Sequence, residues 1–302
     1  MAACLAVVVL RRVVGRRTLD ATWLAFARVP LNALAFRVRR AIGWRRGLPV
    51  HTNEPKDHLF DYLEDRAELE AEERRLRERY DLEALAMRSS RAVYRDNVYV
   101  LSLLDRFVAA KLPEAARELR AIDVGSKDFR YAFALERFLA TSRPEASIDL
   151  LGVEIDGHPV YADLHARADH ADAYAAEVEA SPRAGRAPSR VRYRVGDFLD
   201  VAERAHVVFF FFPFVLRYAI VQWGLPLGHF APERLFRHAA QLLEPGGLLV
   251  VVNHTREELE AQRAILAAID GLDVGASEDA KSRLVDYFEQ LEGRAITVAR
   301  KA

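Results

Sequence analysis

The chain has 302 residues, 51% of them hydrophobic, which suffices for one large domain or for one domain with a helical extension. Its 44 basic and 44 acidic residues cancel, so the global charge gives no argument for nucleic-acid binding. The single cysteine excludes an intramolecular disulfide and fits a reducing compartment, and no spacing of histidines is typical of a metal site. We therefore expect a cytoplasmic protein with no bound metal.

The first fifty residues are strongly basic, with ten arginines and a single acid, Asp20. The opening apolar run, residues 5–10, is far shorter than the roughly 20 residues that span a bilayer, and no basic region precedes it. One interpretation is helices packed on the main domain, with arginine stems covering apolar surface. The alternatives are a cationic amphipathic segment on an anionic membrane, a basic arm on nucleic acid, or a transit peptide.

The next part of the chain predicts two helices. Gly47, Pro49 and Pro55 end the basic segment. Residues 57–88 contain no Gly or Pro and carry leucines at helical spacing, which predicts one long amphipathic helix. Residues 91–110 predict a second, more apolar helix. We therefore divide the chain into a basic amphipathic segment (1–56), a helical extension (57–112) and a core (113–302).

Strands and helices alternate through the core. Strands are predicted over residues 121–124, 149–155, 191–195, 205–212, 248–253 and 295–300. The helices between them are predicted over residues 131–140, 160–179, 232–243 and 257–269. This alternation is typical of an open α/β sheet with right-handed crossovers, in which ligands bind at the carboxyl ends of the strands.

Acidic residues recur at these strand ends. Asp123 lies near the end of the first strand and a turn at Gly125 follows it, Glu154 lies near the end of the second, and Asp197 follows the third. A strand, a tight turn and a helix N-terminus together place backbone N–H groups against a charged or polar ligand. A glycine turn with an acid after each of three successive strands points to a nucleoside-containing cofactor.

From about residue 91 to its end, the chain resembles the class I S-adenosylmethionine-dependent methyltransferases. The matching pieces are residues 122–126 (IDVGS), 152–156 (GVEID), 195–198 (VGDF), 232–235 (PERL) and 243–251 (LEPGGLLVV). The resemblance implies an α/β fold with a Rossmann-like, seven-stranded, mostly parallel sheet. The last strand of that sheet is antiparallel, helices cover both faces, and the N-terminal helical extension lies outside it. It also implies a transferase that uses S-adenosylmethionine.

By this resemblance, Gly125 and Ser126 let the backbone approach the methionine part of the cofactor. Asp123 orders the turn and binds the cofactor's amino group, often through water. An alternative for Asp123 is that it only caps the turn. The family usually has Gly-x-Gly-x-Gly in this loop, whereas Lys127 and Phe129 occupy the second and third glycine positions here. A degenerate cofactor pocket is therefore an alternative, and a nicotinamide dinucleotide site fits less well.

The resemblance assigns the nucleoside part of the cofactor to the next two strand ends. Glu154 accepts hydrogen bonds from the two ribose hydroxyls, since a carboxylate offers two oxygens to a vicinal diol. Asp197 accepts from the adenine amine, and the backbone or ring of Phe198 lines the adenine. The alternative for Asp197 and Phe198 is an ordinary exit from the strand.

The sequence indicates the methyl acceptor less clearly than it indicates the cofactor. In relatives that methylate amines or bases, an acid or Asn, then Pro-Pro and an aromatic, follow the fourth strand; here only Pro213 and Phe214 match. Base methylation is disfavoured, and we expect a small-molecule or lipid-like acceptor and no nucleic-acid partner. His254, Asn253 and Tyr218 are the candidate catalytic groups, and His254 is the candidate general base. Alternatively, His254 and Asn253 cap the next helix.

The leading prediction is thus a cytoplasmic methyltransferase that acts on a small-molecule substrate. One alternative is a catalytically degenerate methyltransferase fold that serves as a scaffold or regulatory protein. Another is a membrane-peripheral protein that acts through its basic N-terminal segment. Polar residues on the helix before the core, Asp96 and Asn97 among them, are further candidates to face the cofactor.

Overall fold

The computed structural model describes residues 23–114, 117–181, 187–285 and 293–302. It has two compact units. The first combines the described part of Met1–Gly43 with Phe214–Pro232, and the second combines Trp44–Pro213 with Glu233–Ala302. The predictions for residues 1–22 lie outside the described residues, and the division at residues 56 and 112 stays a prediction.

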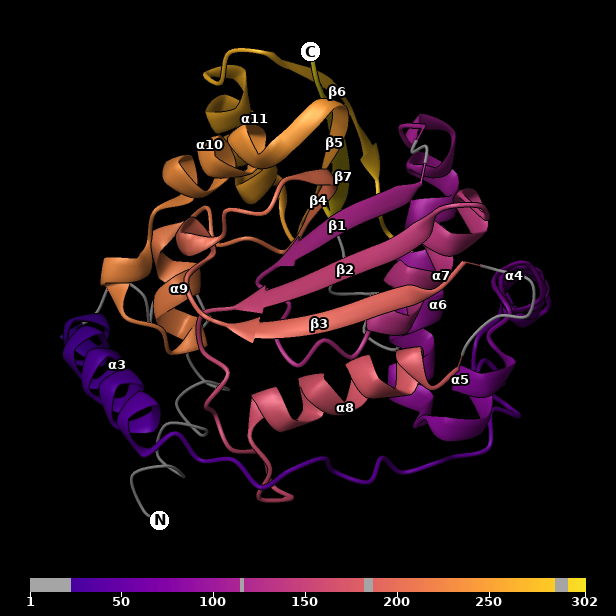
Figure 1. Cartoon of the computed structure of the whole chain (residues 1–302). Coiled ribbons are helices and arrows are strands. Elements are labelled where there is room, and N and C mark those ends of the chain that lie inside the picture. Colours follow the sequence, from indigo (N-terminus) through magenta and orange to yellow (C-terminus); the bar gives the residue numbers. More distant parts are fainter. Residues whose placement is uncertain (1–22, 115–116, 182–186, 286–292) are drawn as a thin grey trace. The chain divides into compact units, whose positions relative to one another are not determined.

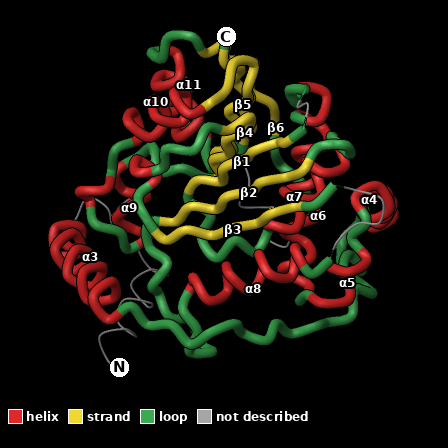
Figure 2. Tube along the Cα trace, viewed as in Figure 1, coloured by secondary structure: helices red, strands yellow, loops and turns green. Residues whose placement is uncertain are grey.

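A seven-stranded sheet forms the centre of the second unit (Figures 1 and 2). The strands, in spatial order, are β3 (Ser189–Val195), β2 (Ser147–Glu154), β1 (Glu118–Val124), β4 (Ala205–Phe211), β5 (Leu243–Asn253), β7 (Ala295–Lys301) and β6 (Leu272–Asp279). β7 is antiparallel to both of its neighbours, β5 and β6, and the other neighbouring pairs are parallel. The expected Rossmann-like sheet with an antiparallel last strand is therefore confirmed.

Helices cover both faces of the sheet. α6 (Arg91–Phe107), α7 (Ala132–Ser142) and α8 (Arg167–Glu179) share one hydrophobic core with a face of the sheet that includes Phe209. α4 (Arg66–Tyr80) and α5 (Glu83–Arg88) add Leu76 and Leu85 to the same core. On the opposite face, Phe236 of α10 (Pro232–Leu242) lies 4.9 Å from Phe210 of β4, ring to ring. The apolar run of β4 is thus buried on both sides, as expected of a central parallel strand.

Two predicted helices are shorter than expected. The predicted helix over residues 57–88 is wrong as a single element, because α4 ends at Tyr80 and α5 begins at Glu83. Asp81 has φ 52°, a left-handed conformation that Asp tolerates, so no Gly or Pro is needed at the break. The helix predicted over residues 160–179 begins only at Arg167, because Val160 and Ala166 form a β-bridge.

Two strands also differ from the sequence prediction. β6 was not predicted; it is a polar edge strand in which every residue is half-buried or exposed, so it lacks an apolar signal. β5 begins at Leu243 rather than at residue 248, because Leu243 already pairs with Ala205 of β4. α11 (Arg256–Ala267) follows β5 close to the predicted position.

The first unit is built on α3 (Trp23–Ile42), α9 (Arg217–Trp223) and the 3₁₀ turn η3 (Leu227–His229). Asn32 Nδ2 donates to the carbonyl oxygens of Val221, at 2.9 Å, and Leu225, at 3.3 Å. The Phe36 ring lies 5.1 Å from that of His229. In the described part of the chain, no helix is both long enough and apolar enough to cross a membrane.

Candidate functional site

The strand order reverses at β1, which lies between β2 and β4. Asp123 stands one residue before the end of β1 and is fully buried. Among the described residues, neither of its carboxyl oxygens makes a hydrogen bond of normal geometry, and the Tyr131 hydroxyl is the donor that lies close enough to interact with it. Burial raises the pKa of Asp123 to about 8; the Tyr131 hydroxyl lowers it and the charge of Glu154 raises it. A buried carboxyl without a well-formed hydrogen bond is costly, so this position suits a cationic or protic ligand group.

The turn after β1 keeps a glycine-like backbone at three alternate positions. φ is 75° at Gly125, 53° at Lys127 and 55° at Phe129. The left-handed conformation costs an L-residue roughly 1–2 kcal/mol, so the surrounding structure must hold Lys127 and Phe129 there. These are the positions of the second and third glycines in the Gly-x-Gly-x-Gly loop that the chain resembles. The loop therefore retains the backbone of the pattern although it lacks two of the glycines.

Phe129 points into the core rather than out of this turn. Its side chain is fully buried, and its ring lies 6.1 Å from that of Tyr193 and 6.4 Å from that of Tyr131. A Cβ atom on Gly152 of β2 would lie 3.0 Å from Phe129 Cζ. The ring therefore packs on the bare backbone of β2 beneath the turn and leaves the outer side of the turn unblocked by this side chain.

The first backbone N–H groups of the turn donate hydrogen bonds to another strand of the protein. The backbone nitrogens of Gly125 and Ser126 donate to the Val153 carbonyl oxygen at 2.8 and 3.2 Å. These bonds extend the pairing of β1 with β2 beyond the last residue of β1. The backbone of the turn is therefore fixed, but these two donors are not directed at a ligand.

Glu154, the last residue of β2, fastens the turn to the following loop. Its Oε2 accepts from the Lys127 backbone nitrogen at 2.9 Å, and its Oε1 accepts from the Asp156 backbone nitrogen at 3.0 Å. Arg167 Nη1 lies 3.8 Å from Oε1. Burial raises the pKa of Glu154, against the charge of Arg167 and the two N–H donors. Because a carboxylate has about four acceptor positions, two remain for vicinal hydroxyls.

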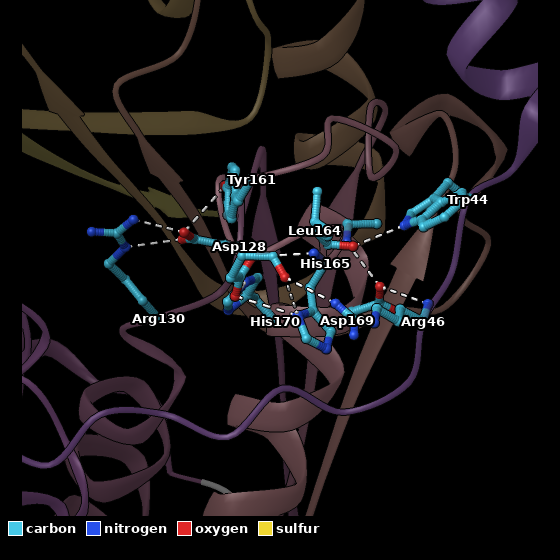
Figure 3. A network of polar contacts seen from close by, with 11 residues as sticks. Trp44, Arg46, Asp128, Arg130, Tyr161, Leu164, His165, Asp169 and His170 are labelled. Atoms are coloured by element: carbon cyan, nitrogen blue, oxygen red, sulfur yellow. Dashed lines mark hydrogen bonds and ion pairs between the residues drawn. The ribbon is translucent and has the colours of Figure 1, made fainter.

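A cluster of charged side chains borders the turn (Figure 3). Arg130 binds Asp128 through two hydrogen bonds of 3.0 and 2.7 Å, and the Tyr161 hydroxyl donates to Asp128 at 3.2 Å. Burial lowers the pKa of Lys127, and the negative charge of Asp128 partly compensates. Sequence reasoning missed Arg130, Tyr161 and Arg167, because nothing in their spacing shows which carboxylates they reach.

An extended segment that begins at Trp44 runs along α8. Trp44 Nε1 donates to the Leu164 carbonyl oxygen at 2.9 Å, and Arg46 N donates to Asp169 Oδ2 at 3.1 Å (Figure 3). Arg45 Nε donates to Asp169 Oδ1 at 2.7 Å. Asp169 Oδ2 also accepts from the Ala166 nitrogen at 2.8 Å and so caps α8. The end of the basic segment thus packs on the core through its arginines.

Asp197 and Phe198 lie where β3 ends, as predicted. Asp197 caps the 3₁₀ turn η2 (Phe198–Asp200), and its side chain accepts from the Leu199 nitrogen at 2.9 Å. The Phe198 ring is buried, 5.9 Å from the ring of Phe210 and 5.1 Å from that of His238. The Phe198 ring therefore belongs to the core, so this residue has only its backbone to offer a ligand.

Of the predicted catalytic residues, Asn253 and His254 lie together at the end of β5. Asn253 is fully buried, and neither polar atom of its side chain has a hydrogen-bond partner among the described residues. The N-cap of α11 is Thr255, so neither Asn253 nor His254 is the cap. Tyr218 lies on α9, in the first unit.

His254 is poorly placed to act as a base. Its ring stacks on Phe212 at 3.9 Å, and its Nδ1 lies 2.9 Å from Arg294 Nη2. A guanidinium only donates, so Nδ1 accepts and the proton of the neutral ring lies on Nε2. Loss of hydration around the ring and the charge of Arg294 both lower the pKa of His254. The geometry therefore favours a structural role for this histidine.

The polar residues of α6 mainly join elements of the protein. Asn97 Nδ2 donates to the Arg130 carbonyl oxygen at 2.9 Å, and Asn97 Oδ1 accepts from the Ala134 nitrogen at 2.9 Å. Asp96 lies 3.6 Å from Arg130 and so adds to the charged cluster beside the turn. Asn97 thereby fixes the start of α7, and Asp96 pairs with an arginine of the charged cluster.

A surface groove of about 410 Å³ lies between α8 and β3. Ala175, Glu179, Val191 and Tyr193 are among its lining residues. The groove runs along the strands rather than at their carboxyl ends, so the predicted cofactor residues do not line it.

Comparison with protein-family models and with curated proteins finds no match. Among solved structures, the chain is similar to geranyl diphosphate C-methyltransferase from Streptomyces coelicolor A3(2), with 13% identity and a TM-score of 0.46 over 70% of this chain and 79% of that chain. It is also similar to magnesium protoporphyrin IX methyltransferase from Synechocystis PCC 6803, with 12% identity and a TM-score of 0.41 over 70% and 85%. Similarities this distant carry no argument about activity.

Proposed function

We propose that this protein transfers a methyl group from S-adenosylmethionine to a small-molecule or lipid-like acceptor. The observation that carries the proposal is Asp123, a fully buried carboxyl at the strand where the sheet order reverses, which makes no hydrogen bond of normal geometry among the described residues and has only the Tyr131 hydroxyl as a nearby donor. Open α/β sheets bind their ligands in the crevice at this point. The turn beside Asp123 supports the proposal, because it keeps left-handed φ angles at residues 125, 127 and 129.

The residues at the three strand ends fit the parts of this cofactor. Asp123 would hold the ammonium group, directly or through water, by a charge-assisted bond. Glu154 would bind the ribose hydroxyls through its two remaining acceptor positions, and Asp197 would accept from the adenine amine. When bound, the cofactor supplies a methyl group on a sulfonium, which is already a good leaving group.

The acceptor would lie against the end of β4, which is apolar. Phe211 is 5.1 Å from Tyr131, ring to ring, and Phe212 stacks on His254. With a reactive methyl donor, the protein mainly has to position the acceptor. Asn253 is the candidate to orient it, because its buried amide has no hydrogen-bond partner among the described residues. In this proposal His254 supports the site and does not act as a base, and a catalytic role for Tyr218, which belongs to the first unit, stays a separate prediction.

One observation favours a second function, that of a non-catalytic scaffold with a methyltransferase fold. The N–H groups of Gly125, Ser126 and Lys127 are all bonded within the protein, to Val153 and Glu154. A turn whose donors are already used binds a ligand less readily than one with free donors.

Calorimetric titration separates these two functions. S-adenosylmethionine and S-adenosylhomocysteine are titrated into the wild type and into Asp123→Asn and Glu154→Gln. Asp200→Asn is the matched control, because Asp200 is an exposed carboxylate on the neighbouring η2 turn. We expect binding by the wild type and the control and a loss of at least about tenfold in the other two variants. A wild type that binds neither compound would refute the enzyme and favour the scaffold.

A further inference from the structure

We propose that α3 docks the first unit on an anionic membrane surface. The proposal concerns a surface of the first unit and does not depend on the methyltransferase proposal. It rests on three features of that unit: an exposed apolar stripe, a separate packed face, and a one-sided charge.

The exposed stripe consists of Leu31, Leu34, Val38 and Ile42. Their exposed fractions are 61%, 60%, 47% and 66%, which is unusual for four aliphatic side chains on one helix. They are spaced by three, four and four residues, and at about 100° per residue this spacing places them on one face of the helix. The stripe is therefore continuous along α3.

The opposite face of α3 is the one that packs. Phe36 is buried and lies against His229, and Asn32 bonds to the carbonyl oxygens of Val221 and Leu225. At about 100° per residue, Asn32 and Phe36 point away from the stripe. The face of α3 that carries Asn32 and Phe36 is the one that packs within the first unit. The stripe is therefore a separate apolar surface that this packing does not cover.

The positive charge of the first unit indicates that the partner of the stripe is an anionic membrane. Residues 23–43 and 214–232 contain five arginines and no aspartate or glutamate. At about 100° per residue, Arg28 and Arg37 lie on the two sides of the stripe, and Arg37 is exposed. An aliphatic stripe with arginines around it matches an interfacial helix, in which apolar side chains enter the bilayer boundary and basic groups bind lipid phosphates. The same unit exposes Trp223 by 44% and Tyr218 by 37%, residue types that favour the membrane interface.

Vesicle sedimentation of the full chain tests this inference. The vesicles contain phosphatidylglycerol and phosphatidylcholine in a ratio of roughly 3:7, and pure phosphatidylcholine is the comparison. The test variants are Leu31→Gln with Leu34→Gln, and Arg28→Gln with Arg37→Gln. The matched controls are Val50→Gln with Met87→Gln, and Arg74→Gln with Arg88→Gln, which change exposed residues of the second unit. Thermal unfolding verifies that every variant folds.

We expect the wild type to bind anionic vesicles and added salt to weaken the binding. The leucine variant should bind at least about tenfold more weakly, and each lost arginine should cost about fivefold. Both controls should bind as the wild type does. The inference is overturned if the wild type does not bind, or if the leucine variant binds equally well. It is also overturned if the stripe instead holds a second copy, seen as a dimer that the leucine variant dissolves.

Discussion

At the residue scale, the three acids at consecutive strand ends have different surroundings. Asp123 makes no hydrogen bond of normal geometry among the described residues, Glu154 accepts from two backbone N–H groups, and Asp197 caps a turn. The sequence predicted all three positions, because each lies at or just after the end of a predicted strand. It did not predict these differences, because Lys127 and Arg167 reach Glu154 across 27 and 13 positions of the chain.

Asp123 makes the stability of the unliganded protein depend on pH. Its folded pKa of about 8 lies above the ordinary value of 3.8, so the folded state holds this proton more tightly than the unfolded state. The free energy of unfolding should therefore fall as the pH rises from about 4 to about 8. Asp123→Asn should remove that part of the fall. Urea unfolding of both proteins at about pH 5 and about pH 8 measures it, and an equal fall in the variant would refute the assignment.

Two substitutions of Lys127 test whether the backbone at this position is strained. Lys127→Ala and Lys127→Gly both remove the side chain, but only glycine adopts φ 53° without a steric cost. We expect the glycine variant to be more stable than the alanine variant by about 1 kcal/mol in urea unfolding. An alanine variant as stable as the glycine variant would mean that the turn relaxes to another conformation.

At the element scale, the sequence predicted the strands with an apolar run or a clear alternation and missed β6, which has neither. β4 and β5 were found because their buried residues are consecutive and apolar, and β3, in which only Val191 is buried, was found from its alternation, whereas β6 is a half-exposed edge strand without either signal. The break between α4 and α5 rests on a left-handed aspartate, Asp81, which carries no signal in a charged helix. Element types thus followed from local pattern, and the missed boundaries depended on tertiary packing.

Gly152 joins β2 to the turn after β1. A Cβ at this position would lie 3.0 Å from Phe129 Cζ and 3.1 Å from two further ring carbons, so Gly152→Ala forces the ring to move. We expect a loss of about 1–3 kcal/mol in the free energy of unfolding, together with weaker cofactor binding. Gly196→Ala is the matched control, because nothing lies within 4 Å of its added Cβ. Equal losses in the two variants would show that Phe129 does not depend on this contact.

At the scale of the whole molecule, the sheet order decides where a ligand can bind. The reversal at β1 brings the ends of β1, β2 and β4 to one edge, and the acids of β1 and β2 lie at that edge. The sequence predicted this sheet from its alternation and from the motifs that resemble methyltransferases. The membership of residues 214–232 in the first unit had no sequence signal, because it depends on contacts with α3 rather than on local pattern.

Cofactor binding should stabilise the molecule as a whole. A ligand at 100 times its Kd adds about 2.7 kcal/mol, which corresponds to a rise in Tm of roughly 5–10 °C for a domain of this size. Thermal unfolding with and without S-adenosylhomocysteine measures the rise. Asp123→Asn should abolish most of it, and a rise that is unchanged in this variant would place the ligand elsewhere.

The most direct test of the central claim is a crystal structure of the protein with S-adenosylhomocysteine. The account predicts the ribose hydroxyls within hydrogen-bond distance of Glu154 and the ammonium group at Asp123, directly or through one water. A ligand bound away from the carboxyl ends of β1 and β2, or none at a saturating concentration, would contradict it.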